Sequence, residues 1–251
     1  MHLTYYGANS WLLEFDDLRV LIDPWLVGSL VFGNMPWLFK GDRTEPIEEL
    51  PTDIDLILLS QGLEDHAHRL TLQKLSHTIP VIASPNGAKV AKELSYSTVV
   101  ALQPGESHTF NNVLDIRALS GAPIGLNVEN GYWLHHEPSH MSLYYEPHGF
   151  PPSALENLED VDIAISPVVN LELPLAGAII QGQKTALEIA KALQPKVFLP
   201  TAAGGDIQYS GLLDKILTSV GGGSQFEQAL TDSGLSTKFV SPQPQVSFEV
   251  C

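Results

Sequence analysis

Short apolar segments of strand type occur in two batches along this chain, and each batch is followed by alternating helices and strands. Runs of aliphatic and β-branched residues between turn residues are typical of strands, and apolar residues three and four apart are typical of helices that cover a sheet. Two batches therefore predict two sheets, each covered by helices. The expected fold class is α/β (α+β), a four-layer α/β/β/α sandwich that forms a single domain over residues 1–251.

The individual elements follow from the same patterns. In the first batch we expect strands at residues 10–15, 19–23, 54–60 and 80–85, and helices at 69–76 and 86–94. In the second batch we expect antiparallel strands between residues 98 and 147, then a strand at 160–168, a helix at 182–193, a strand at 196–202, a helix at 224–234 and a terminal strand at 238–250. Asn86 is a candidate N-cap, and the Glu-Asn-Gly sequence at 129–131 is typical of a turn.

The charge of the chain excludes several classes of partner. The net charge is −16 with only 13 Lys and Arg, so a basic patch for nucleic acid is not expected, and an anionic membrane surface would repel the protein. The first residues lack the basic region and apolar core of a signal peptide, and no apolar run approaches the roughly 20 residues of a membrane span. We expect a cytoplasmic protein whose partner is a small-molecule substrate or ligand; the oligomeric state stays open.

Cysteine usage restricts the metal chemistry. Cys251 is the one cysteine of the chain, so no disulfide can form within it, and a zinc site built on thiolates is excluded. Any transition metal must be bound by carboxylates or by some of the nine histidines.

Polar residues gather directly after the apolar strand that is expected at residues 54–60. The sequence Ser60-Gln61-Gly62-Leu63-Glu64-Asp65-His66 runs from this strand into a turn, where carboxylate and imidazole side chains could meet. Glu64 and Asp65 are adjacent carboxylates, and a shared buried site would raise the pKa of one of them and make it a candidate acid or base.

Five segments of the sequence carry a resemblance to a known family. They are YYGANSWLLEF (5–15), VLIDPWL (20–26), SQGLEDH (60–66), LYYEPHG (143–149) and TALEIAKALQPKVFLPTA (185–202). In this order they resemble the metallo-β-lactamase superfamily, and within it the branch that contains the ascorbate-6-phosphate lactonases. The resemblance covers most of residues 3–207 and implies a metal-dependent hydrolase on the α/β/β/α sandwich.

The resemblance also implies that most of the metal ligands of this family are missing. Gln61 and Leu63 stand where the family has its first two loop histidines, residues 118–125 contain no histidine for the third, and the last falls near Ala202. Asp65 and His66 remain, and in the family this pair belongs to the second metal site. The position of the bridging aspartate falls close to His148.

We therefore predict a reduced site with a single metal, bound by Asp65, His66 and His148. One carboxylate and two imidazoles can hold Zn²⁺, Fe²⁺ or Mn²⁺ with an open position for water. Glu146 stands two residues before His148, and along a strand both would face the same side. The candidate catalytic residues are thus Asp65, His66 and Glu146, and the substrate is a small ester, lactone or phosphoester.

Other interpretations of these residues stay open. Asp65 and His66 could form a pair that caps the loop, with no metal and no catalysis, in a protein that binds a ligand or a partner on the same fold. Gln61, Leu63 and Ala202 at ligand positions favour this alternative. Acid–base chemistry without a metal is a third possibility.

The sequence leaves the roles of several further histidines and of a set of aromatic residues open. His135, His136, Glu137 and His140 form either a solvated loop between strands or a loop that folds over the site and replaces missing ligands. His68 could reach the same site as His66. A third set, Trp25, Phe32, Trp37 and Phe39, could line an apolar pocket, form a dimer contact or pack in the core.

Overall fold

The computed structural model describes residues 1–124, 127–153, 155, 158, 161–174, 177–202 and 207–250. The chain divides into two units. Unit 1 comprises Met1–Leu102, Gly204–Ile216 and Pro242–Cys251, and unit 2 comprises Gln103–Ala203 and Leu217–Ser241. Each unit has a large sheet of its own, and the single domain over residues 1–251 stays a prediction.

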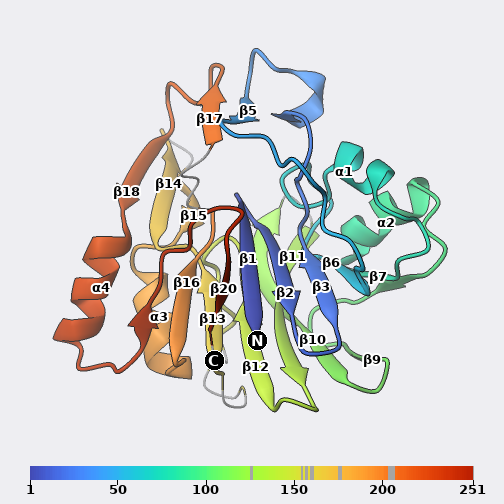
Figure 1. Cartoon of the computed structure of the whole chain (residues 1–251). Coiled ribbons are helices and arrows are strands. Elements are labelled where there is room, and N and C mark those ends of the chain that lie inside the picture. The colour runs from blue at the N-terminus through green and yellow to red at the C-terminus, as the bar shows by residue number, and fades with distance from the viewer. Residues whose placement is uncertain are drawn as a thin grey trace. The chain divides into compact units, whose positions relative to one another are not determined.

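The large sheet of unit 1 has the strand order β20-β1-β2-β3-β6-β7-β8 (Figure 1). Its strands are β1 His2–Gly7, β2 Ser10–Glu14, β3 Arg19–Ile22, β6 Leu56–Leu59, β7 Val81–Ala83, β8 Val99–Ala101 and β20 Ser247–Glu249. The strands β1, β2 and β3 pair in antiparallel fashion, and the strands from β3 to β8 pair in parallel. All four residues of β6 are buried, as expected for a continuous apolar run in a central parallel strand.

Two helices pack against this sheet, α1 Arg69–Lys74 and α2 Pro85–Glu93 (Figure 1). Leu72 of α1 and Ala88 of α2 share one hydrophobic cluster with Leu21, Ile57 and Val81 of the strands. The predicted helices of this half of the chain are therefore confirmed, and their apolar sides face the sheet.

The N-cap of α2 differs from the prediction. Ser84, not Asn86, holds the cap position, and its Oγ accepts a hydrogen bond from the backbone N of Gly87 at 3.3 Å. Pro85 occupies the first turn, where a missing N–H costs nothing. Asn86 supports the cap from inside the helix, since its Oδ1 accepts hydrogen bonds from the Ser84 hydroxyl and from Gly87 N.

The large sheet of unit 2 has the strand order β19-β16-β13-β12-β11-β10-β9. Its strands are β9 Ser107–Phe110, β10 Leu114–Ile124, β11 Asn127–His136, β12 Met141–Tyr145, β13 Ile163–Ser166, β16 Val197–Pro200 and β19 Lys238–Phe239. The helices α3 Thr185–Leu193 and α4 Gly223–Asp232 pack on it through a cluster that includes Ile189, Phe226 and Phe198. Both helices are as predicted.

Two small sheets were not expected from the sequence. Unit 2 contains β14 Val169–Leu173, β15 Gly177–Gln181 and β18 Thr218–Gly221 in the order β15-β14-β18. Unit 1 contains β4 Leu30–Val31, the short 3-10 helix η1 Phe32–Asn34, β5 Lys40–Arg43 and β17 Ile207–Ser210, in the sheet order β17-β5-β4. Strands of two to five residues from distant parts of the chain leave little local periodicity to detect.

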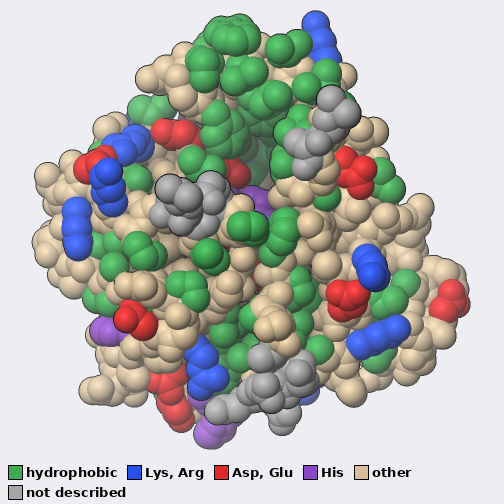
Figure 2. Space-filling model, turned by 180° about the vertical axis from the view of Figure 1, so that it is seen from behind, with side chains coloured by type: hydrophobic (Ala, Val, Ile, Leu, Met, Phe, Trp, Pro, Cys, Tyr) green, Lys and Arg blue, Asp and Glu red, His purple; other side chains and the backbone are tan. Residues whose placement is uncertain are grey.

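Exposed apolar side chains surround the small sheet of unit 1. They gather at the top of the space-filling view, over the part of the chain that carries β5 and β17 (Figure 2). The large exposed hydrophobic residues of this part are Met35, Trp37, Tyr209, Leu212 and Ile216. The four aromatic residues considered above take different positions: Trp25 is fully buried, Phe32 and Phe39 pack against its cluster, and Trp37 is 65% exposed. Core packing is therefore the correct interpretation for Trp25.

Three further sequence-based expectations were wrong. Residues 129–131 lie inside β11 and not in a turn, because Gly131 serves a close contact instead: a Cβ there would lie 3.2 Å from the Tyr145 carbonyl oxygen. The segment 238–250 forms not one strand but β19 and β20, in different sheets, since Pro242 and Pro244 interrupt any ladder between them. The strand β8 pairs in parallel with β7, whereas antiparallel strands were expected from residue 98 onward.

Within the part of the chain that the structure describes, no helix has both the length and the apolar composition needed to cross a lipid bilayer.

Asp162 joins three strands of unit 2 and provides a test of this sheet. Its Oδ2 accepts hydrogen bonds from Ser142 N at 2.9 Å and from Ser142 Oγ at 3.0 Å, and its Oδ1 lies 2.7 Å from Lys196 Nζ. We expect Asp162→Asn to lower the free energy of unfolding by about 1–3 kcal/mol, because hydrogen bonds to a charged acceptor are lost. Urea unfolding measures this, with Asp232→Asn on the exposed side of α4 as a control that should change stability by less than about 0.5 kcal/mol. Equal effects of both substitutions would contradict the assigned role.

Candidate functional site

The loop after β6 directs His66 into the interior of unit 1. The backbone N of His66 and the backbone N of Ala67 both donate to the Leu63 carbonyl, at 3.0 and 2.7 Å, and this closes a tight turn. Gly62 is required for the path of the loop, because a Cβ there would lie 2.7 Å from the carbonyl oxygen of Asn86. The turn leaves Leu63 exposed and His66 fully buried.

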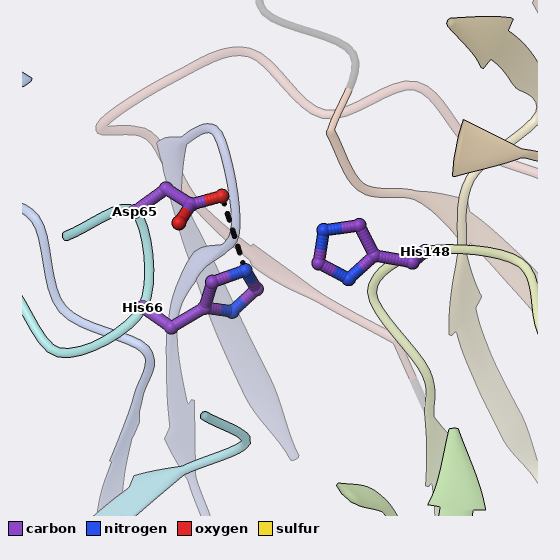
Figure 3. A group of neighbouring side chains, drawn as sticks. All are labelled: Asp65, His66 and His148. Atoms are coloured by element: carbon purple, nitrogen blue, oxygen red, sulfur yellow. Dashed lines mark ion pairs between the residues drawn. The ribbon is translucent and has the colours of Figure 1, made fainter. Parts of the chain in front are cut away.

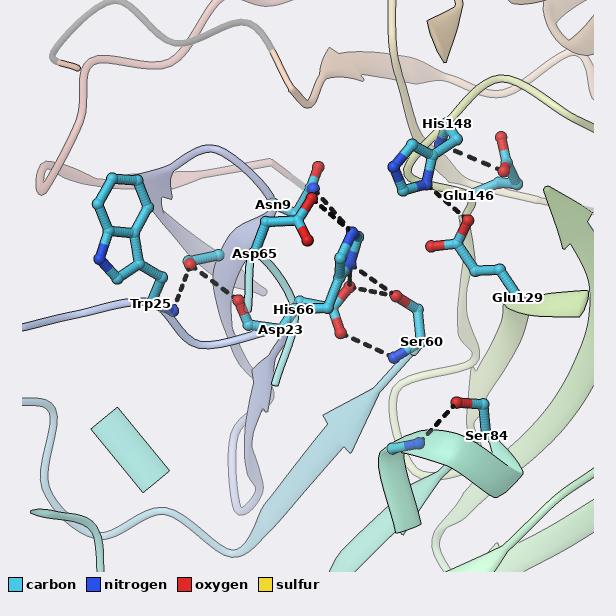
Figure 4. A network of polar contacts seen from close by, with 12 residues as sticks. Asn9, Asp23, Trp25, Ser60, Asp65, His66, Ser84, Glu129, Glu146 and His148 are labelled. Carbon is cyan, nitrogen blue, oxygen red and sulfur yellow. Dashed lines mark hydrogen bonds and ion pairs between the residues drawn. The ribbon is translucent and has the colours of Figure 1, made fainter. Parts of the chain in front are cut away.

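A buried carboxylate holds one nitrogen of His66 (Figure 4). His66 Nδ1 lies 2.7 Å from Asp23 Oδ2, and both side chains have no solvent exposure. Asp23 follows β3 directly, with a left-handed φ of +42°, a conformation that Asp and Asn adopt more readily than most residues. Ser60 completes the contact: its backbone N and its hydroxyl donate to the two carboxylate oxygens of Asp23, at 2.7 and 2.5 Å.

The other nitrogen of His66 faces two further polar groups. Nε2 lies 3.2 Å from Asp65 Oδ2 (Figure 3) and 3.3 Å from Asn9 Nδ2. Burial alone would lower the pKa of His66, but the carboxylates of Asp65 and Asp23 outweigh it and raise this pKa well above its usual value. Each ring nitrogen of His66 therefore lies within about 3.2 Å of a carboxylate oxygen.

Ser60 does not form a nucleophilic triad with these residues. Its hydroxyl lies 2.9 Å from Nδ1 of His66, the same nitrogen that Asp23 contacts, and Ser60 is fully buried. In a serine hydrolase the nucleophile and the aspartate contact different nitrogens of the histidine. Ser60 therefore positions Asp23 and His66.

The residues of this loop fit one metal ion better than two. Neighbouring ligands of a metal with bonds of about 2.0–2.2 Å lie roughly 3–3.5 Å apart, and the 3.2 Å between His66 Nε2 and Asp65 Oδ2 matches this spacing. Leu63 offers no donor atom. Gln61 is 1% exposed, and its Oε1 has no hydrogen-bond partner among the described residues, so a third potential ligand atom, an amide oxygen, is buried in the same loop.

In unit 2, His148 lies in a turn that follows β12. Glu146 shapes this turn, since its Oε1 accepts a hydrogen bond from His148 N at 3.2 Å and its Oε2 accepts from Gly149 N and from Phe150 N. Burial, and then the charge of Glu129, raise the pKa of Glu146 to about 7. The turn begins at Glu146, so this residue and His148 do not share a regular strand, and Glu146 acts as a cap for backbone N–H groups.

Glu129 of β11 holds the ring of His148 (Figure 4). His148 Nδ1 lies 2.6 Å from Glu129 Oε2, and Glu129 has no solvent exposure, whereas the His148 side chain is 13% exposed. Each unit therefore contains one histidine whose Nδ1 is held by a buried carboxylate. Because His148 belongs to one unit and Asp65 and His66 to the other, their common site stays a prediction.

The other predicted residues have local roles. His68 caps α1: its Nδ1 accepts a hydrogen bond from Thr71 N, and its Nε2 donates to the Ser29 carbonyl at 3.3 Å. Burial lowers the pKa of His68 to about 4. Glu64 is partly buried, and burial raises its pKa more than Asp65 does.

The histidines after Trp133 lie at the other end of β12 from His148. His136 ends β11, residues 137–140 form the turn into β12, and His148 follows the opposite end of that five-residue strand. The turn is thus about 16 Å from the His148 turn along the strand, and it does not replace ligands there.

Three residues that contact His66 or His148 were not assigned from the sequence, namely Asn9, Asp23 and Glu129. Asp23 stands in the Ile-Asp-Pro sequence at the end of a predicted strand, which is a usable signal. Asn9 and Glu129 have no local signal, because their partners lie 57 and 19 residues away.

Comparisons with known proteins place these residues in a wider context. A family model described as the beta-lactamase superfamily domain matches residues 2–202. The chain is 22% identical over 266 aligned positions to a UPF0173 metal-dependent hydrolase from Methanopyrus kandleri, with 99% of this chain and 100% of that protein covered.

Solved structures show the same fold. A possible metal-dependent hydrolase from Veillonella parvula has a TM-score of 0.72 at 12% identity, with 99% of this chain and 98% of that chain covered. A metallo hydrolase from Ignicoccus hospitalis has a TM-score of 0.66 at 16% identity, with the same coverage. The predicted fold class is confirmed, whereas the branch within the family stays a prediction.

The cap formed by His68 provides a test of how the loop is anchored. The pKa of about 4 in the folded protein lies below the usual 6.5, so the unfolded chain binds more protons between these values, and stability should fall as the pH drops from about 6.5 to 4. We expect His68→Ala to lower the free energy of unfolding at pH 7 by about 1–2 kcal/mol, and His68→Asn, which keeps a cap acceptor, by less. Thermal unfolding between pH 4 and 7 measures both effects. An unchanged acid profile in His68→Asn would refute the assignment.

Proposed function

Because this chain belongs to the metallo-β-lactamase superfamily, we propose that it is a metal-dependent hydrolase with a reduced site for one divalent ion. One observation carries this proposal: the imidazole of His66 is fully buried, with Nδ1 2.7 Å from the carboxylate of Asp23. Histidines that bind metals are almost always held through their second nitrogen in this way, which fixes the tautomer and the ring orientation. The relative from Methanopyrus kandleri is named as a metal-dependent hydrolase, which supports the same function.

The residues of the loop have distinct roles in this proposal. His66, through Nε2, and Asp65, through Oδ2, bind the ion, and His148 is the predicted third ligand. Asp23 and Ser60 are positioning residues that orient the His66 ring. An imidazole with carboxylates and no thiolate suits Zn²⁺, Fe²⁺ or Mn²⁺. When bound, such an ion supplies a water of lowered pKa and polarises a carbonyl or phosphoryl oxygen.

A cavity in unit 2 supports a proposal for the substrate class. It has a volume of about 450 Å³, within the range of small-ligand pockets, and its walls include Gly149, Phe150, Pro151 and Thr185. Among the described residues that line it, Glu188 is the one that carries a charge, and that charge is negative. Together with the net charge of −16, this favours an uncharged ester or lactone over a phosphoester.

Metal analysis tests the proposal directly. We expect protein purified without chelators, or reconstituted after dialysis, to bind about one metal equivalent per chain at the His66 site, and we expect His66→Ala and Asp65→Asn to lower the bound metal by about that one equivalent. Asp23→Asn should keep the fold, because Asn tolerates the left-handed φ, but should weaken metal affinity about 10–100-fold. Elemental analysis and isothermal titration calorimetry provide the readouts, and His148→Ala tests the predicted third ligand.

His2→Ala serves as the matched control, because His2 is exposed on β1 and contacts none of these residues in the described networks. If the wild-type chain binds no metal after reconstitution, the enzyme proposal fails and the alternative, a protein that binds a ligand or partner on the same fold, is favoured. Hydrolysis that persists in the presence of chelators would instead favour acid–base chemistry without a metal.

Substrate preference tests the role of the cavity. We expect kcat/KM for p-nitrophenyl acetate to exceed that for p-nitrophenyl phosphate by at least about tenfold. Glu188→Gln should reduce this ratio by about two- to tenfold, the effect of removing one charge several ångströms from the substrate. Glu227→Gln on the exposed side of α4 is the control. If Glu188→Gln leaves the ratio of the two kcat/KM values unchanged, the cavity does not determine the substrate preference.

A further inference from the structure

A tight turn between β11 and β12 gathers three residues with metal-binding side chains in unit 2. His136 pairs with Met141 across the hairpin, and residues 137–140 form the turn. Two contacts hold the turn: Glu137 N donates to the Val113 carbonyl at 2.9 Å, and His136 Nδ1 lies 2.8 Å from Ser139 Oγ.

The side chains of His135, Glu137 and His140 approach one another at this turn. Each offers one ligand atom, and these atoms lie within 4.8 Å of one another. His135 Nε2 lies 4.0 Å from Glu137 Oε2, and the rings of His135 and His140 have centroids 6.5 Å apart. Tetrahedral Zn²⁺ with bonds of about 2.0–2.1 Å needs ligand atoms roughly 3.4 Å apart, so small rotations of the exposed Glu137 and His140 side chains would close the site.

One of the three ligands is fixed in advance. The ring of His135 stacks on Trp133 with centroids 5.7 Å apart and an angle of 7° between the planes. Trp133 is itself buried, and the guanidinium of Arg117 lies 5.3 Å from its ring centroid. A ligand whose rotamer is already held loses less conformational entropy when it binds.

The charge around the turn also favours a cation. Asp115 of β10 lies directly opposite His135 in the sheet, so both side chains are on the same face. Together with Glu137, this places two carboxylates beside two imidazoles, on a chain whose net charge is −16.

We propose that His135, Glu137 and His140 form a separate binding site for a divalent transition-metal ion, such as Zn²⁺, at the β11–β12 turn. Three protein ligands leave one position of a tetrahedral ion to water or to a further ligand. The site is at the end of β12 opposite to His148, so it does not depend on the proposed hydrolase site.

His140 makes a sharp test possible, because its φ of +54° lies in the left-handed region. Asn and Gly adopt this conformation at lower cost than most residues, so His140→Asn and His140→Gly remove the ligand without straining the turn. Both variants should unfold at the same temperature as the wild type or a higher one in the absence of metal.

The experiment is a calorimetric titration of the full, tag-free and metal-depleted chain with ZnCl₂. We expect a binding event that persists in His66→Ala and in the control His2→Ala, and that weakens at least about tenfold in His140→Asn, in His140→Gly and in Glu137→Gln. Zn²⁺ should raise the unfolding temperature of His66→Ala but not that of the double variant His66→Ala/His140→Asn.

Three results would overturn the proposal. If the binding event that persists in His66→Ala has the same Zn²⁺ affinity after His140→Asn is added, His140 is not a ligand. A chain whose Zn²⁺ binding disappears entirely in His66→Ala would have no second site. In crystals soaked with ZnCl₂, an anomalous peak bound by His135 and His140 would support the proposal, and its absence at full occupancy of the His66 site would contradict it.

Discussion

The buried carboxylate of Asp23 is the contact on which the candidate site of unit 1 depends. A carboxylate without solvent exposure is costly unless hydrogen bonds compensate its charge, and here Ser60 N, the Ser60 hydroxyl and His66 Nδ1 provide them. These donors come from the end of β6 and the turn after it, while Asp23 follows β3. The parallel pairing of β3 with β6 therefore brings Asp23 to the loop that carries His66, and the carboxylate of Asp23 orients the His66 ring.

Unit 2 also contains buried carboxylates whose charge must be compensated by hydrogen bonds, those of Glu146 and Glu129. Glu146 satisfies its oxygens with backbone N–H groups of its own turn, and Glu129 binds the ring of His148. The two acids therefore have different roles: Glu146 shapes the turn, and Glu129 orients the imidazole of His148. Each unit thus contains a histidine together with the buried carboxylate that holds its Nδ1.

Elements whose residues follow a local hydrophobic period can be predicted from the sequence. The role of a residue cannot be predicted in this way when it depends on a contact with a residue far away in the chain. The apolar run of β6 and the amphipathic helix α3 were both predictable in this way. Gly131 was interpreted as a turn residue, because the reason for a glycine there lies on β12 and not beside it. In the candidate site, Asp65 and His66 follow from their place after a strand. Glu129 could not be found, because only the sheet register brings it to His148.

The edge of the large sheet in unit 1 has a consequence for biosynthesis. Strand β1 is covered on its outer side by β20, so that His2 pairs with Glu249. Because β1 is synthesised long before β20, the backbone groups on its outer side stay unpaired until β20 has been made, and the closure of so long a loop is slow. During that interval the nascent chain exposes a template for aggregation, and chaperones that shield extended segments become relevant to its yield in the cell.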